Sequence, residues 1–153
     1  MFSEKKDTNE PAVLAITERK IRATLWINVK NHSAEAVDEA LKELFAGFGD
    51  HYHEVFKSIT VDNGSEFANL SNLEFDGVNV YFTHPYTSSD KGTVECHNRM
   101  LRRFIPKGKS ISNYSADDTL IFADLINALP RKRLGYRTPE ELFDKELDRI
   151  YAA

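Results

Sequence analysis

Two carboxylates occupy positions that suit metal-dependent chemistry, Asp62 and Glu95. Asp62 ends the short hydrophobic run 58–62 and precedes Asn63 and Gly64. Ligand sites in open α/β sheets form at the carboxyl ends of strands, so this aspartate is well placed to hold a metal ion. The tripeptide Asp-Asn-Gly is also typical of a plain turn, because each of its residues favours turn conformations. Taken alone, the tripeptide favours the turn over the metal ligand.

Glu95 lies in a predicted helix over residues 93–104, on a polar and basic face. Helical spacing gathers on this face Lys91, Glu95, Asn98, Arg99 and Arg102. Such a face suits contact with phosphate groups. The competing interpretation is a solvated face on which Glu95 pairs with Arg99, an interaction that contributes about 0.3–0.5 kcal/mol.

Considered together, the two carboxylates point to phosphodiester chemistry. That reaction needs metal ions to neutralise the scissile phosphate, to activate the attacking hydroxyl and to stabilise the leaving oxygen. Two Mg²⁺ or Mn²⁺ ions about 3.5–4 Å apart, held by hard carboxylate oxygens, provide all three effects. A strand-end Asp62 and a helical Glu95 that converge on one cleft would match this arrangement, and both are the candidate catalytic and metal-binding residues.

The net charge of −4 is unusual for a nucleic-acid-binding protein, which normally carries a basic excess. The positive side chains are concentrated, however, in residues 99–109 and 130–137. Arg131 and Arg133 can be read either as a solvated helix end or as phosphate contacts. The predicted DNA-binding residues are Lys91, Asn98, Arg99, Arg102, Arg103, Lys107, Arg131 and Arg133.

These residues need a mixed α/β scaffold to position them. Alternation of apolar and polar residues predicts a hairpin of strands over Ala12–Thr17 and 22–30. A helix is predicted to begin after the N-cap Ser33 and to end at Gly47. The remaining predicted elements are strands over 58–62 and 78–83, a loop over 84–92, and helices over 93–104, 116–129 and 139–147.

Length and composition narrow the class of protein. The 153 residues, 41% of them hydrophobic and 29% charged, fit one globular domain. Cys96 is the single cysteine, so the chain has no disulfide framework and the reducing cytoplasm is the expected location. No apolar run is long enough to span a membrane, so no membrane partner is expected. We expect a polar tail over residues 1–11, a catalytic core over 12–147 and a second tail over 148–153.

Five segments resemble the retroviral-integrase-like DDE transposases, especially those of insertion sequences. These segments are residues 17–20 (TERK), 59–67 (ITVDNGSEF), 84–95 (HPYTSSDKGTVE), 95–108 (ECHNRMLRRFIPKG) and 130–143 (PRKRLGYRTPEELF). The resemblance runs from about Ala12 to about Glu146, with the motifs in the family's order. It implies a ribonuclease H-like fold, with a mixed central sheet flanked by helices.

The resemblance also implies an activity and a site. Family members use an Asp-Asp-Glu triad to bind two Mg²⁺, and Asp62 matches the second aspartate and Glu95 the glutamate. They hydrolyse a phosphodiester at the transposon end, and the freed 3′-hydroxyl then attacks target DNA. The implied partners are transposon-end and target DNA, together with further copies of the chain in a homo-oligomer.

One departure concerns the first aspartate of the triad. It should lie on a strand that precedes Ala12–Thr17, but residues 1–11 show no apolar alternation and end in Pro11. Asp7, the only aspartate there, is not assigned this role. We therefore expect a core that is truncated before the first catalytic aspartate, or a degenerate copy. Because carboxylate count tunes metal affinity, we expect these 153 residues alone to be inactive.

Two other functions fit the same residues. The chain could be a DNA-binding or oligomerising module that keeps the fold without the chemistry, in which case Asp62→Asn would leave DNA affinity unchanged. It could also be a ribonuclease H-like nuclease acting on RNA–DNA hybrids or junctions, which would cleave such substrates without strand transfer.

Overall fold

A computed structural model describes residues 9–61, 64–82 and 88–153. Its centre is a β-hairpin formed by β1 (Ala12–Thr17) and β2 (Thr24–Val29), paired antiparallel from Ala12 opposite Val29 to Thr17 opposite Thr24. The predicted hairpin is thus confirmed, although β2 is shorter at both ends than the expected strand over 22–30. Alternation along the two strands separates their side chains into two faces.

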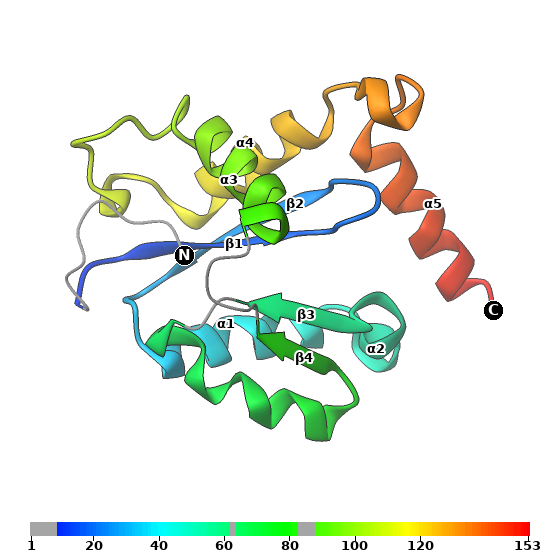
Figure 1. Cartoon of the computed structure of the whole chain (residues 1–153), viewed down its shortest axis with the longest axis horizontal. Coiled ribbons are helices and arrows are strands. Elements are labelled where there is room, and N and C mark those ends of the chain that lie inside the picture. Colours follow the sequence, from blue (N-terminus) through cyan, green and yellow to red (C-terminus); the bar gives the residue numbers. More distant parts are fainter. Residues whose placement is uncertain (1–8, 62–63, 83–87) are drawn as a thin grey trace.

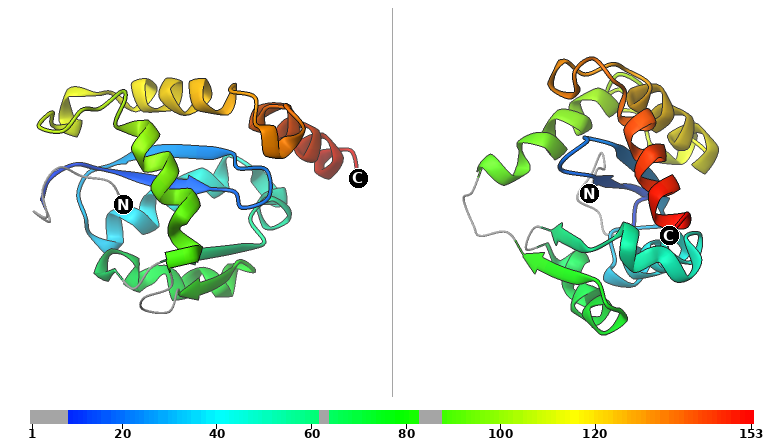
Figure 2. Two further views of the ribbon diagram at one scale, coloured as in Figure 1. Left: turned by 45° about the horizontal axis from the view of Figure 1, so that its top comes forward. Right: turned by 90° about the vertical axis from the view of Figure 1, so that its right-hand side faces the viewer.

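Each face of the hairpin packs against its own hydrophobic core. Ala12 and Leu14 lie in the core that also contains α1, whereas Val13 and Trp26 lie in the core formed with the C-terminal helices. Figure 2 shows the hairpin between these two layers, with α3 and α4 on one side and α1 on the other. Burying both faces makes the hairpin the element against which the helices are positioned.

Helix α1 (Ala34–Ala46) begins and ends as the sequence predicts. The Ser33 side chain accepts a hydrogen bond from the Ala36 N–H at 3.2 Å, which satisfies one free donor of the first turn. Val37, Leu41 and Phe45 are buried on one side of the helix. The chain turns after Gly47 and continues through η1 (Gly49–His51) and α2 (Tyr52–Val55).

The next segment forms a second, parallel pair of strands. β3 (Ser58–Val61) pairs with β4 (Asn79–Phe82), and the 3-10 helix η2 (Ser65–Asp76) connects them. The predicted strands over 58–62 and 78–83 are confirmed with slightly shorter bounds, whereas η2 was not predicted. Within the described residues the strands form two two-stranded sheets, one antiparallel and one parallel, where the sequence suggested one mixed sheet.

Helices dominate the second half of the chain (Figure 1). They are α3 (Ser88–Leu101), η3 (Ile111–Asn113), α4 (Ala116–Asn127), η4 (Lys132–Leu134) and α5 (Pro139–Tyr151). Capping boxes at Ser115 and Thr138 begin α4 and α5. In the described part of the chain, no helix combines the length and apolar character needed to cross a membrane.

Two predicted boundaries in this half are wrong. The loop expected over 84–92 ends earlier, because α3 already begins at Ser88. The helix expected over 139–147 continues to Tyr151, so it includes part of the predicted tail. The Tyr151 hydroxyl donates a 2.9 Å hydrogen bond to the Phe48 carbonyl, which fixes the end of α5 near the end of α1.

Candidate functional site

Glu95 lies on α3 with an exposed side chain. Its carboxylate makes no hydrogen bond or ion pair with a described residue, and in particular none with Arg99 one turn further along the helix. The alternative in which Glu95 only pairs with Arg99 on a solvated face is therefore not observed. The carboxylate is available for a ligand.

The other residues expected on this face are distributed along α3 and the turn that follows it. Arg99 is exposed, Arg102 is half-buried just beyond the helix, and Asn98 has a buried Oδ1 without a partner among the described residues. The backbone of Lys91 belongs to α3, but its side chain lies outside the described part of the structure. Asp62 also lies outside the described residues.

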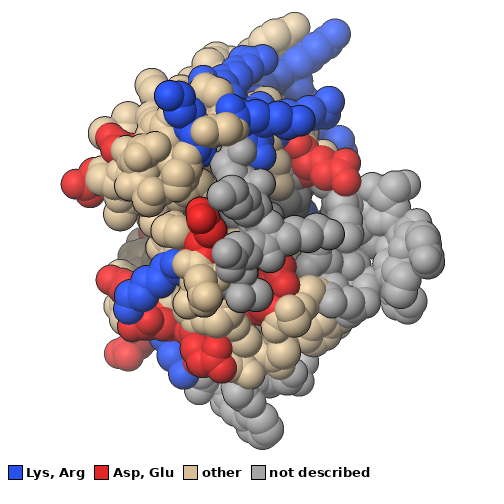
Figure 3. All heavy atoms as spheres, turned by 90° about the vertical axis from the view of Figure 1, so that its left-hand side faces the viewer, with Lys and Arg blue, Asp and Glu red and all other residues tan. Residues whose placement is uncertain are grey.

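The basic segment continues after α3. Arg103 and Lys107 are exposed on the chain that connects α3 to η3. Viewed from the side that faces left in Figure 1, lysine and arginine side chains gather on the upper part of the molecule, and most acidic side chains in view lie below them (Figure 3). The negative net charge thus coexists with a mainly basic upper surface on this side of the molecule.

Arg131 and Arg133 lie in a compact turn between α4 and α5. The backbone of Arg131 closes this turn, because its N–H donates to the Arg137 carbonyl at 3.0 Å and its carbonyl accepts from the Leu134 and Tyr136 N–H groups, each at 2.9 Å. Both Gly135 and Tyr136 have φ of 65°, which completes the reversal of the chain. The turn is therefore held by its own backbone, and it presents its arginines toward α3.

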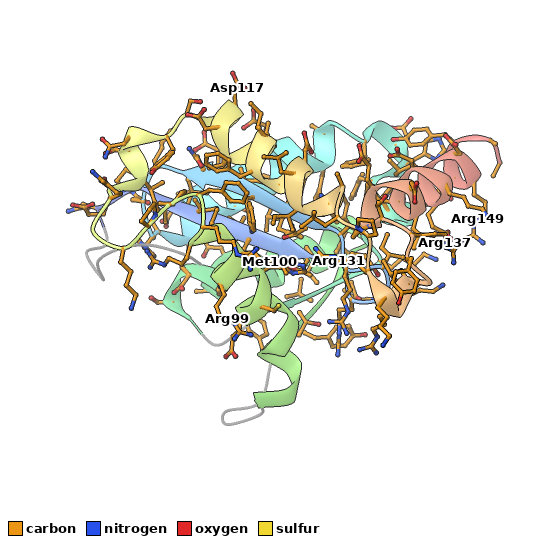
Figure 4. All side chains as sticks on the ribbon, turned by 90° about the horizontal axis from the view of Figure 1, so that it is seen from above. Arg99, Met100, Asp117, Arg131, Arg137 and Arg149 are labelled. Atoms are coloured by element: carbon orange, nitrogen blue, oxygen red, sulfur yellow. The ribbon has the colours of Figure 1, made fainter. Side chains whose placement is uncertain are left out.

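A pocket of about 340 Å³ lies between this turn, α3 and the loop that joins β1 to β2. Its lining includes Arg22, Cys96, His97, Met100, Arg131 and Arg133. Figure 4 shows Met100 beside Arg131, with Arg99 lying elsewhere on the same helix. The structure thus brings Arg131 and Arg133 to the side of α3 that carries Cys96 and Met100, one quarter-turn from Glu95.

A network of hydrogen bonds connects His97, which lines the pocket, to the β-hairpin and to α4. His97 is only 3% exposed, and its Nδ1 shares a 3.3 Å hydrogen bond with the Thr17 hydroxyl. Thr24 lies next to Thr17, and the side-chain amide of Asn127 bonds both backbone groups of Thr24, accepting at 2.9 Å and donating at 2.8 Å. Burial, followed by the positive charges of Arg131 and Arg22, lowers the pKa of His97 to about 4. His97 is therefore neutral near pH 7.

Arg22 was not predicted as a functional residue. It has a φ of 63°, a left-handed conformation that is rare for a long side chain, in a turn where its N–H donates to the Glu18 carbonyl at 3.1 Å. The sequence signal for it is the basic run of residues 19–22, which resembles a family motif through Lys20 but was interpreted only as a turn.

The donor chemistry of the face suits a hard divalent cation, since carboxylate oxygens are the ligands that Mg²⁺ prefers. Among the described residues, no three His, Cys, Asp or Glu side chains form a metal-binding cluster. Glu95 is thus an exposed carboxylate on this face, outside any such cluster of described residues.

Comparison with known proteins identifies relatives of the chain. No family model matches it. It is 37% identical over 139 residues to a probable transposase of the insertion-like element IS1161 of Streptococcus salivarius, covering 91% of this chain and 38% of that protein. It is 30% identical over 141 residues to the transposase InsI of element IS30A of Escherichia coli, covering 90% of this chain and 36% of that protein. The chain thus spans under two fifths of the length of these two relatives.

Comparison with solved structures finds a similar fold. A chain in the structure of the simian T-cell lymphotropic virus intasome, in complex with a PP2A regulatory subunit, matches with a TM-score of 0.61 and 15% identity. The match covers 94% of this chain and 57% of that one. The expected α/β, ribonuclease H-like fold class is thereby confirmed. The chain is therefore similar in sequence to part of these insertion-sequence transposases, and similar in fold to a chain of that viral intasome.

Proposed function

We propose that the chain acts as the catalytic core of a DDE-type DNA transposase or integrase, with Asp62 and Glu95 as metal ligands. The observation that carries the proposal is the exposed carboxylate of Glu95 on α3, which has no partner among the described residues and lies one turn from Arg99, in a chain whose relatives are transposases. An acid left without a partner among basic neighbours is poorly explained by stability, because pairing would stabilise the helix more.

In this proposal Asp62 and Glu95 hold two Mg²⁺ or Mn²⁺ ions, together with a third carboxylate from outside residues 12–147. Bound ions would neutralise the scissile phosphate and activate the attacking water or 3′-hydroxyl. The chain's own residues position the DNA: Arg99 and Arg102 are near Glu95 and can contact the phosphates on either side of the reacting one. The reaction is hydrolysis at a transposon end followed by strand transfer into target DNA.

The DNA-contacting surface in this proposal extends from α3 to the turn between α4 and α5. Its members are Lys91, Asn98, Arg99, Arg102, Arg103, Lys107, Arg131 and Arg133. Such contacts are mostly insensitive to sequence, so recognition of a particular transposon end must rest on other parts of the protein. A homo-oligomer and a cytoplasmic location, where DNA is accessible, are part of the same proposal.

Metal binding provides a test that does not depend on activity. The free Mn²⁺ signal in electron paramagnetic resonance would be followed while Mn²⁺ is added to the wild-type chain, to Asp62→Asn and to Glu95→Gln. We expect weak binding by the wild type and a loss of about tenfold or more in affinity in each variant, because ligand charge sets affinity. Glu39→Gln, an exposed acid that pairs with Lys30, is the matched control.

The outcomes separate the proposed function from its alternatives. Equal Mn²⁺ binding in all four proteins would contradict the metal site and favour a DNA-binding module without chemistry. Cleavage of RNA–DNA hybrids without strand transfer would favour the nuclease. Robust Mg²⁺-dependent strand transfer by these 153 residues would contradict the expectation that they are inactive alone.

A further inference from the structure

The pocket between α3, the β1–β2 loop and the turn before α5 has a composition that the proposed metal site does not explain. The side chains of Arg22, Arg131 and Arg133 all contribute to the lining of a cavity of about 340 Å³. Among the described residues, no carboxylate pairs with any of them. We propose that this pocket binds one nucleotide of a DNA strand, with its phosphate on the arginines and its nucleoside against Cys96 and Met100.

Arg131 is already oriented for this role. Its Nη2 donates a 3.1 Å hydrogen bond to the Ile126 carbonyl near the end of α4, which fixes the plane of the guanidinium. Its Nε is buried and has no acceptor within the described part of the chain. A buried donor without a partner destabilises the fold, so a ligand oxygen or a bound water is expected to satisfy it. A guanidinium held by one contact and unsatisfied at another is suited to bind phosphate with little loss of entropy.

Arg22 adds a second indication. Its left-handed backbone is strained for a residue other than glycine, and such strain is concentrated at functional positions. Glycine would relieve the strain but would remove the guanidinium from the pocket. The hydrogen bonds from Arg22 to Glu18 and from Glu18 to Ala23 hold this conformation in place.

The wall of the pocket formed by α3 suits a ligand larger than an inorganic anion. Cys96 and Met100 are one turn apart on α3 and provide polarisable, largely apolar surface. A cavity of this size is at the lower end of the range for small-molecule sites, and it far exceeds the volume of phosphate alone. Sulfur atoms and guanidinium planes both pack well against the face of a base.

This inference rests on the DNA-binding part of the proposed function, but not on its chemistry. Cys96 and Met100 lie on a different side of α3 from Glu95, since successive helical residues are rotated by about 100°. A strand that reaches the carboxylate with one phosphate could therefore place another nucleotide, unpaired, in the pocket. Extrusion of a base from a duplex costs a few kcal/mol, so single-stranded ends are the favoured ligands.

Cys96 gives a direct measure of occupancy, because it is the single cysteine of the chain and lines the pocket. Its alkylation by N-ethylmaleimide, an uncharged reagent, would be followed by mass spectrometry with inorganic phosphate, thymidine monophosphate or a single-stranded oligothymidylate. At a ligand concentration of about ten times Kd, a competing ligand slows the reaction about tenfold. We expect this protection from the oligothymidylate, weaker protection from the mononucleotide, and little from phosphate.

Variants identify the groups responsible. Arg133→Gln and Arg22→Gln should each weaken ligand affinity about tenfold, the usual effect of losing one hydrogen-bonded charge. At the same ligand concentration, the slowing of alkylation would then fall from about tenfold to about twofold. Arg133 is exposed, and its side chain makes no hydrogen bond or ion pair with a described residue, so its variant should fold normally, which circular dichroism would verify. Arg149→Gln removes the same charge from α5, far from the pocket (Figure 4), and should leave protection unchanged.

Several results would overturn the inference. One is the absence of protection by any of the three ligands, and another is equal protection in the wild type and both pocket variants. Protection by phosphate as strong as that by the oligothymidylate would also overturn it, as would protection by the mononucleotide but not by the strand. Loss of protection in the pocket variants, combined with unchanged Mn²⁺ binding in Asp62→Asn and Glu95→Gln, would leave the pocket standing and remove the proposed metal site. Unchanged protection in the pocket variants, combined with weaker Mn²⁺ binding in Asp62→Asn and Glu95→Gln, would support the metal site and remove the nucleotide pocket.

Discussion

His97 Nδ1 and Thr17 Oγ1 are 3.3 Å apart, and their hydrogen bond joins the middle of α3 to the end of β1. Because α3 also carries Glu95, this contact helps to set where the carboxylate lies relative to the hairpin. His97 is buried beside two arginines, which explains why it remains neutral in the folded protein.

The lowered pKa of His97 predicts a pH-dependent stability. The imidazole titrates at about 4 when folded and at 6.5 when unfolded, so between these values the unfolded state binds more protons. The free energy of unfolding should therefore fall as the pH falls from 6.5 towards 4, by about 2 kcal/mol at pH 5.

Urea unfolding of the wild type and of His97→Gln, measured from pH 7 to pH 5, would check this effect. Glutamine can still bond the Thr17 hydroxyl but does not titrate, so the variant should lose less stability over the same interval. Carboxylates that titrate at low pH affect both proteins and cancel in the difference. Parallel pH profiles would show that His97 does not contribute.

Asn127 should be important for stability although it is not among the predicted site residues. Its side-chain amide satisfies both the N–H and the carbonyl of Thr24, which is buried. Asn127→Leu would leave these groups without partners, at a cost of about 2 kcal/mol or more. Thermal or urea unfolding would measure the loss, and Asp124→Ala, on an exposed position of the same helix, should change stability by far less.

Trp26 should couple the core to the functional helix. Its side chain is fully buried in a cluster with Leu101 and Ile105, at and just beyond the end of α3. Trp26→Ala should cost about 3–5 kcal/mol and speed amide exchange in α3. Trp26→Phe is the milder control, since the indole N–H has no partner among the described residues and its loss breaks no hydrogen bond. Equal exchange rates in α3 for the two variants would contradict the coupling.

The basic face should bind DNA in a salt-dependent manner. Each phosphate contact adds about 0.9 to the slope of log affinity against log salt concentration. Arg99→Gln and Arg103→Gln should therefore each weaken binding of a duplex at low salt and lower this slope by about one. Fluorescence anisotropy across a salt series would measure both quantities. Lys30→Gln, which removes an exposed cation paired with Glu39, should leave the slope unchanged; an equal effect of all three variants would indicate only a general charge effect.

The sequence predicted the elements of the fold well wherever periodicity was strong. The hairpin, α1 and α4 follow from alternation and helical spacing, and Ser33 caps α1 as expected. The early start of α3 at Ser88 was missed because its first residues, Ser-Ser-Asp-Lys-Gly, favour turns. Tertiary context overrides such local preferences, and it cannot be read from the sequence.

The candidate site was predicted only in part. The placement of Glu95 and Cys96 on different sides of the helix could be predicted, because the rotation per residue in an α-helix is fixed. The association of Arg22 with Arg131 could not be predicted, since it depends on a left-handed turn and on the docking of two distant segments. The role of Asp62 remains a prediction, because that residue lies outside the described part of the structure.

The pair of hydrogen bonds between Thr24 and Asn127 joins segments 103 positions apart. Contacts of such long range form late during folding, after most of the entropy of loop closure has been lost. Arg22 and Arg131 flank these two residues in the chain, so their meeting depends on the same late event. Partly folded intermediates would therefore lack the pocket, and any ligand that binds it would select the finished native state and slow its unfolding.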